Sequence, residues 1–232
     1  AEEYKKRVLQ LGEDRTKVFN VGGLGADIST KINLFNKKEL ENILGFEFKK
    51  KNLIITYHPE TLDFISNEYQ IDSLLISLGK FDDIGLIFTM PNADNRGKEI
   101  DRKIKTFCLK NSNSIYVKSL GQKKYYSCLK IVDGVVGNSS SGICEAPSFN
   151  IGTVNIGERQ KGRLRCESII DVANSEREIT KAIRLIISEK FKSKIKNVLN
   201  PYQAKNTAEN IVRIIKDIDL DGIAKKKFFD IL

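Results

Sequence analysis

Residues 134–163, GVVGNSSSGICEAPSFNIGTVNIGERQKGR, decide how the rest of this sequence is interpreted. The apolar run GVVG leads into a turn of asparagine and serines, and a short apolar stretch follows. This order predicts a strand that passes through a tight turn directly into a helix. At such a junction, backbone N–H groups and hydroxyls point at one spot, at the positive end of the helix dipole. Pro147 comes soon afterwards, so we expect the helix to be short.

Charged residues follow this turn at spacings that suit a nucleotide. Glu145 lies one helical turn after the serines, and Arg159, Lys161 and Arg163 come just after a second strand-like run, TVNIG. Guanidinium groups and N–H donors bind phosphate, and a carboxylate accepts hydrogen bonds from two vicinal ribose hydroxyls. The stretch therefore indicates a site for a nucleoside diphosphate.

Strand-like and helix-like segments alternate along the whole chain. The strand-like runs are apolar on both faces, which is typical of a parallel sheet covered on both sides. We therefore expect an α/β fold, a Rossmann-like parallel sheet with helices on both faces. The expected strands are 17–23, 52–60, 84–92, 114–120, 134–137, 153–157 and 167–173. The expected helices are 2–11, 34–45, 70–81, 98–110, 123–131, 176–189 and 207–218, with the short helix after the serine turn.

Polar residues stand where the expected strands end. His58 follows the first buried strand, Asn92 the second, Ser139 and Ser140 the GVVG strand, and Arg159 the strand after it. The carboxyl ends of parallel strands share one edge of a sheet, and ligands of α/β folds bind at that edge. The convergence of these residues on one edge is stronger evidence than any one of them alone.

Each candidate also has a plainer interpretation. His58, the single histidine, could be a structural imidazole; otherwise it would contact phosphate or sugar, or transfer a proton. Asn92 could be an ordinary turn residue. Glu145 could be a solvated helix acid, Arg159 a surface charge, and the serines a simple helix cap.

Composition narrows the range of partners. The net charge of +9 favours anionic ligands, but acids are interleaved with the bases and no basic and aromatic stripe indicates nucleic acid. The four cysteines form no CxxC pair, so we expect no metal site, no disulfide and a cytoplasmic location. No apolar run approaches ~18 residues, so no membrane span is expected. Neither a GKS or GKT P-loop nor a GxGxxG sequence is present, and no cofactor is expected.

Several stretches together resemble a known family. They are RVLQLGEDRTKVFNVGGLGAD, ITYHPET, MPNAD, VVGNSSSGICEAPSF, VNIGERQKGR, NPYQAKNTAENIV and DLDGIAKKKFFDI. They are similar to the C-terminal half of the hydrolysing UDP-N-acetylglucosamine 2-epimerases of the sialic-acid pathway, and the resemblance runs over nearly the whole chain. It implies one half of a glycosyltransferase-B-like architecture, in which two Rossmann-like halves face each other across a cleft.

The resemblance also implies which residues bind UDP or a UDP-sugar: His58, Asn92, Ser139, Ser140, Glu145 and Arg159. The histidine and the arginine would contact the diphosphate, and the serines would bind phosphate at the helix start. The glutamate would hold the ribose hydroxyls, and the asparagine would shape the nucleotide pocket.

The same resemblance divides the chain and its chemistry. Residues 1–32 would be the end of the N-terminal domain and the hinge, 33–200 the nucleotide-binding domain, and 201–232 a helix and tail that cross back. The family reaction removes the C2 proton, expels UDP from C1 and adds water to the glycal, which gives N-acetylmannosamine. The catalytic carboxylates would lie ahead of residue 1. This chain is therefore expected to supply the groups that stabilise the negative charge on the departing UDP.

Three other functions remain open. The first is the same chemistry on a GDP-linked or diacetamido sugar of the legionaminic type. The second is a stand-alone nucleotide-binding module or an inactive truncated product. The third is a retaining glycosyltransferase of similar architecture, but GNSSSG together with RQKGR favours the epimerases. We also expect apolar surface on 2–11 and 207–218 to drive self-association into a homo-oligomer.

Overall fold

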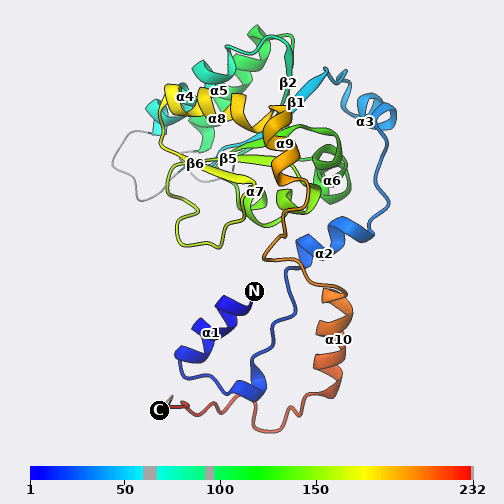
Figure 1. Cartoon of the computed structure of the whole chain (residues 1–232), viewed down its shortest axis with the longest axis vertical. Helices are drawn as coiled ribbons and strands as arrows, with labels where there is room; N and C mark the ends of the chain where they lie inside the picture. Colours follow the sequence, from blue (N-terminus) through cyan, green and yellow to red (C-terminus); the bar gives the residue numbers. More distant parts are fainter. Residues whose placement is uncertain (60–66, 92–96, 231–232) are drawn as a thin grey trace.

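The computed structural model describes residues 1–59, 67–91 and 97–230. Its centre is a six-stranded sheet in the order β3-β2-β1-β4-β5-β6 (Figure 1). The strands are β1 (Lys51–Thr56), β2 (Ile84–Thr89), β3 (Ser114–Val117), β4 (Gly134–Gly137), β5 (Gly152–Ile156) and β6 (Ile169–Val172). All the strand pairs in this order are parallel, so the fold class expected from the sequence is confirmed.

Helices cover both faces of the sheet because side chains alternate along each strand. On β1, Leu53 and Ile55 belong to one buried cluster, and Ile54 belongs to the other. The helices of the first face are α4 (Asn67–Leu78), α5 (Gly97–Lys110), α8 (Glu176–Ile186) and α9 (Glu189–Ile195). The helices of the second face are α3 (Lys37–Leu44) and α6 (Gly121–Ile131). The apolar runs that we expected to form buried strands are therefore covered by helices on both sides.

One sequence-based prediction of secondary structure is wrong. Residues 17–23 form no strand: a short 3-10 turn, η1 (Arg15–Lys17), precedes chain without a sheet partner, and helix α2 (Leu24–Lys31) follows. This segment leads away from the sheet, so its apolar residues have no ladder to join (Figure 1). The helix expected over 176–189 is present as α8 (Glu176–Ile186), and a separate helix that the sequence did not predict, α9, begins after its cap Ser188.

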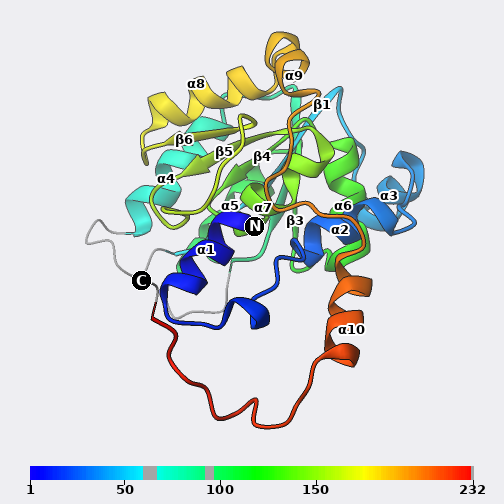
Figure 2. The same ribbon diagram turned by 60° about the horizontal axis from the view of Figure 1, so that its bottom comes forward.

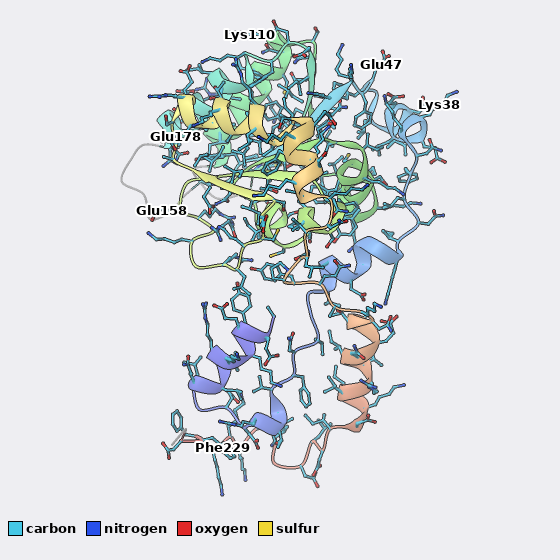
Figure 3. All side chains as sticks on the ribbon, in the orientation of Figure 1. Lys38, Glu47, Lys110, Glu158, Glu178 and Phe229 are labelled. Atoms are coloured by element: carbon cyan, nitrogen blue, oxygen red, sulfur yellow. The ribbon has the colours of Figure 1, made fainter. Side chains whose placement is uncertain are left out.

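Helices α1 (Glu2–Gln10) and α10 (Thr207–Asp217) were both expected, and both lie outside the sheet layers. With the segment between α1 and α2 and the C-terminal tail, they form an extension beside the main body (Figures 1 and 2). The tail returns to the first part of the chain, where the N–H of Phe229 donates to the Gly12 carbonyl at 2.9 Å. Figure 3 labels Phe229 at the far end of this extension.

The extension exposes large apolar side chains, namely Val8, Leu11, Phe19, Val212, Ile215, Leu220, Phe228 and Phe229. Self-association through this surface stays a prediction. We expect sedimentation velocity to show association that weakens in Ile215→Lys, because Ile215 is 62% exposed on α10. Leu109→Lys is the matched control, since Leu109 is 89% exposed on α5 of the main body. A chain that stays monomeric at high concentration would contradict the prediction.

Asp27 of α2 joins the two chain segments that connect the main body to the extension. Its carboxylate is 3% exposed and accepts hydrogen bonds from the N–H groups of Asn206 (3.2 Å) and Thr207 (3.0 Å), at the start of α10. It also pairs with Lys31 at 3.1 Å. Burial raises the pKa of Asp27, but the hydrogen bonds from Lys31 and from the α10 backbone outweigh burial and hold that pKa below its usual range.

Replacing Asp27 with alanine removes this cap, and we expect the free energy of unfolding to fall by about 1–2 kcal/mol at pH 7. The folded pKa is depressed, so the contribution is complete above the unfolded pKa of about 3.9 and is lost as the pH falls through the folded value. Urea unfolding of the unmodified chain and of Asp27→Ala gives the difference between their free energies of unfolding. We expect this difference to be smaller at about pH 3 than at pH 7. Asp14→Ala, which removes the cap of the exposed η1, is the control and should cost less. An equal difference in the free energy of unfolding at the two pH values would contradict the role of the ionised carboxylate.

Candidate functional site

The candidate site lies where the strand order of the sheet reverses. The chain moves outward from β1 through β2 to β3, and then returns to the other side of β1 with β4. Such a reversal leaves a crevice at the carboxyl ends of the strands, and ligands of open α/β sheets bind there. A cavity of about 440 Å³ occupies this place, with walls from the ends of β1 and β2, the segment between β3 and α6, and the turn after β4.

Gly137 brings the ends of β1 and β4 together. Its φ of 135° lies in the region that favours glycine, and a Cβ added there would stand 2.0 Å from the carbonyl oxygen of Thr56. The N–H of Asn138 donates to that same carbonyl at 3.2 Å. The close contact of the two strand ends sends the chain into the serine turn at the mouth of the cavity.

The serine turn opens a very short helix, α7 (Ser140–Cys144), and a 3-10 turn, η2 (Ala146–Phe149), follows with Pro147 near its start. The short helix expected from the proline is therefore confirmed. Ser139 is the N-cap, and its hydroxyl accepts from the N–H of Ser141 at 3.4 Å. Ser139 and Ser141 line the cavity, and Ser140 begins the helix.

Glu145, at the end of α7, lines the cavity and is held by a chain of hydroxyls. The hydroxyl of Ser141 donates to its Oε2 at 2.7 Å, so the Tyr125 hydroxyl must be the donor in its hydrogen bond to Ser141. Burial, and next the nearby Glu145 charge, raise the pKa of Tyr126 to about 12, and burial also raises the pKa of Tyr125. Both phenols stay protonated at neutral pH, so Tyr125 remains a donor in the chain that orients the carboxylate.

The other oxygen of Glu145 faces helix α2. A Cβ added to Gly25, the second residue of that helix, would stand 2.5 Å from Oε1 of Glu145. Gly25 therefore leaves the space that this carboxylate occupies.

Arg159 lies in the loop after β5 and is tied to the turn after β4. Its Nη1 donates to the carbonyl of Asn138 at 3.0 Å, and Nε2 of Gln160 donates to the same carbonyl at 2.9 Å. Arg159 is exposed, and its bond to Asn138 holds it beside the serine turn, whose Ser139 lines the cavity. A guanidinium has five N–H donors, so this one contact leaves most of them for an anion.

The other cations of this loop are held by neighbouring groups. Lys161 pairs with Glu158 at 2.9 Å, and Arg165 pairs with Asp171 at 2.7 Å. Figure 3 marks Glu158 on this loop, which extends from the carboxyl edge of the sheet. Nη1 of Arg163 lies 3.5 Å from the sulfur of Cys144. Arg159 is thus the cation of the loop that is bonded to the turn after β4.

Three of the residues predicted from the sequence, His58, Ser139 and Glu145, line the one cavity. Ser140 is the first residue of α7, directly after the lining residue Ser139, and Arg159 bonds to Asn138, the residue before Ser139. Asn92 lies outside the described residues.

Sequence reasoning did not single out Asn138, Ser141 or Tyr125. Asn138 and Ser141 stood inside the quoted turn, but their roles depend on contacts with His58 and Tyr125 from distant parts of the chain. Tyr125 stood in a helix with no motif to distinguish it from a core aromatic.

Within residues 1–59, 67–91 and 97–230, no group of three or more histidine, cysteine, aspartate or glutamate side chains could hold a metal ion. All four cysteines are free thiols. Among the described helices, none has the length and apolar character needed to cross a bilayer.

The chain is thus an open parallel α/β sheet with a cavity at its reversal point, where ligands of such sheets bind. The model of the UDP-N-acetylglucosamine 2-epimerase family matches residues 1–216, so this chain belongs to that family. The family expected from the sequence motifs is thereby confirmed.

Two curated relatives are similar along almost the whole chain. The Escherichia coli polysialic acid biosynthesis protein P7 is 43% identical over 99% of this chain and 59% of the relative. The Campylobacter jejuni GDP/UDP-N,N'-diacetylbacillosamine 2-epimerase (hydrolyzing) is 42% identical over 99% of this chain and 60% of the relative. The chain therefore spans about 60% of the length of the relatives it matches.

Solved structures support the fold. The S. aureus MnaA–UDP co-structure superposes with a TM-score of 0.71 at 18% identity, and the match covers 99% of this chain and 60% of that one. The UDP-GlcNAc 2-epimerase of Methanocaldococcus jannaschii, solved with UDP-GlcNAc and UDP, gives a TM-score of 0.68 at 17% identity, over 93% of this chain and 59% of that one. At this level of identity the likeness shows the fold alone.

Proposed function

We propose that this chain is the UDP-binding part of a hydrolysing UDP-N-acetylglucosamine 2-epimerase, which converts UDP-GlcNAc and water into N-acetylmannosamine and UDP. The observation that carries the proposal is the cavity at the reversal point of the sheet, which His58, Ser139 and Glu145 line, with Arg159 fixed at its edge. No cofactor takes part in the proposed reaction.

The residues divide by the part of UDP that their chemistry suits. Arg159 and His58 would contact the diphosphate, because a guanidinium and an imidazole both donate hydrogen bonds to phosphate oxygens. Ser139 and Ser140 would bind phosphate at the serine turn. Glu145, already oriented by Ser141, would accept hydrogen bonds from the ribose hydroxyls. Asn92 is proposed to shape the nucleotide pocket.

These groups would act on the leaving-group side of the reaction. Expulsion of UDP from C1 places negative charge on the diphosphate, and donors fixed in advance stabilise that charge as it develops. A base for the C2 proton requires a tuned carboxylate or imidazole. We assign the main carboxylates of that step to the part of the relatives that this chain does not span, with His58 as the one candidate here.

The same chemistry on a diacetamido sugar is a second candidate. It is favoured by the name of the Campylobacter jejuni relative, which gives both GDP and UDP forms of diacetylbacillosamine. The E. coli relative is named for polysialic acid biosynthesis and favours the first candidate at nearly equal identity. A nucleotide-binding module without turnover is the third.

Calorimetric titration of this chain with UDP and, in parallel, GDP tests the proposal. We expect saturable UDP binding that weakens about tenfold or more in Arg159→Ala, which corresponds to about 1.4 kcal/mol. Arg184→Ala, which removes an exposed arginine of α8, should bind UDP as the unmodified chain does. Preference for GDP would favour the second candidate, and binding of neither nucleotide would refute a UDP site in this chain.

We also propose a cytoplasmic location, because four free thiols suit a reducing compartment. UDP or a UDP-sugar is the proposed partner, together with further copies of the chain in a homo-oligomer.

A further inference from the structure

We propose that Asn138 is the positioning residue of the site, which holds the loops after β1, β4 and β5 in register so that His58, Ser139 and Arg159 face one diphosphate. This inference rests on the proposed function, because it says how the nucleotide site is built. Asn138 contacts no ligand in this role, and it acts through the residues on either side of it.

The side chain of Asn138 ties down the loop after β1. Its Oδ1 accepts from the backbone N–H of His58 at 2.7 Å, and its Nδ2 donates to the backbone carbonyl of His58 at 2.8 Å. Asn138 is 0% exposed, so both bonds are shielded from water. A pair of buried bonds to one residue fixes the place and the orientation of the backbone that carries the imidazole.

The main chain of Asn138 adds a second contact with β1 and connects it to the loop after β5. Its N–H donates to Thr56, at the end of β1, and its carbonyl accepts from Arg159 and Gln160, in the loop after β5. All four polar groups of Asn138 are therefore used: the side-chain amide and the main-chain N–H bond to the end of β1 and the loop after it, and the carbonyl bonds to the loop after β5. Ser139, the next residue, is placed by the same contacts.

An asparagine suits this position for a chemical reason. An aspartate would turn a carboxylate oxygen toward the carbonyl of His58, where Nδ2 now donates, and would add a negative charge beside a phosphate site. Serine is too short to reach both backbone groups. The neutral amide supplies one donor and one acceptor without charge.

Asn52 offers a matched control at the opposite end of β1. It is 3% exposed, its Oδ1 accepts from the N–H of Lys49 at 2.9 Å, and its Nδ2 donates to the carbonyl of Lys49 at 2.9 Å. The amide thus makes the same two bonds to one backbone, but far from the cavity. Loss of either amide should disturb folding in a similar way, and only loss of Asn138 should disturb the site.

The test is calorimetric titration with UDP of the unmodified chain, Asn138→Ala and Asn52→Ala, each shown to be folded by circular dichroism. We expect UDP affinity to fall about tenfold or more in Asn138→Ala and to change less than about twofold in Asn52→Ala. Equal affinities in the two variants would overturn the proposal. Where Asn138→Ala does not fold, Asn138→Ser and Asn52→Ser replace the pair, because serine cannot reach both backbone groups and adds no charge beside the phosphate site.

A second readout needs no ligand. His58 is the single histidine, so its imidazole signals identify it directly in NMR spectra, and its backbone N–H reports on the bond to Asn138. We expect slow hydrogen exchange at this N–H in the unmodified chain and in Asn52→Ala, and fast exchange in Asn138→Ala. Unchanged exchange in Asn138→Ala would overturn the positioning role. Failure of the unmodified chain to bind UDP would instead refute the proposed function, and the exchange result would stand apart from it.

Discussion

Replacing Gly137 with alanine is expected to lower the free energy of unfolding by about 3 kcal/mol or more. Two independent costs add at this position. The φ of 135° is a conformation that L side chains rarely adopt, and the new Cβ would lie 2.0 Å from the carbonyl oxygen of Thr56. The clash is with backbone in the central strand β1, so no side chain can move aside to relieve it. Urea unfolding at neutral pH measures the loss.

Gly45→Ala is the control for the cost of a positive φ alone. Gly45 ends α3 with a φ of 61°, and nothing lies within 4 Å of the position of an added Cβ. Alanine there should cost only about 1–2 kcal/mol, the usual penalty of the left-handed conformation. Equal losses at the two glycines would mean that the ends of β1 and β4 do not approach as closely as described.

The sheet could be predicted because its strands carry the signal locally. Ile84–Thr89 and Gly134–Gly137 are short apolar runs between polar turns, and each forms a strand within the expected range. The wrong prediction at 17–23 also came from local sequence alone. Val18 and Val21, followed by a glycine pair, resemble a strand that ends in a turn. A strand also needs a neighbouring strand, and the local sequence does not show whether one is present.

The candidate site could be predicted only as a set of strand ends. His58 and Ser139 follow strands that the sequence marks, and the rule that ligands bind at the carboxyl edge brings them together. The contacts that organise the edge could not be predicted. Asn138 bonds to His58 across 80 positions of sequence, and the hydroxyl of Tyr125 reaches Glu145 through Ser141 only once α6 and α7 are packed.

Replacing Gly25 with alanine is expected to weaken UDP binding about tenfold while leaving the fold as stable as before or slightly more stable. Alanine stabilises a helix relative to glycine, and Gly25 is the second residue of α2. The new Cβ would stand 2.5 Å from Oε1 of Glu145, which is the far end of a flexible side chain and can rotate away. Rotation gives up the hydrogen bond from Ser141, a loss that the gain in helix propensity offsets, and it takes the carboxylate from the place where we propose that it holds the ribose.

A residue that matters only for packing would change the stability, whereas a residue that shapes the site changes the UDP affinity. Both quantities are therefore measured on Gly25→Ala. Urea unfolding gives the stability, and calorimetric titration gives the affinity for UDP. A double-mutant cycle with Glu145→Ala adds the decisive comparison, because without the carboxylate there is nothing for the new methyl group to displace. Gly25→Ala should then cost no further affinity. An equal loss of affinity in the presence and absence of Glu145 would mean that Gly25 acts on the nucleotide by another route, through α2 and its bonds to the start of α10.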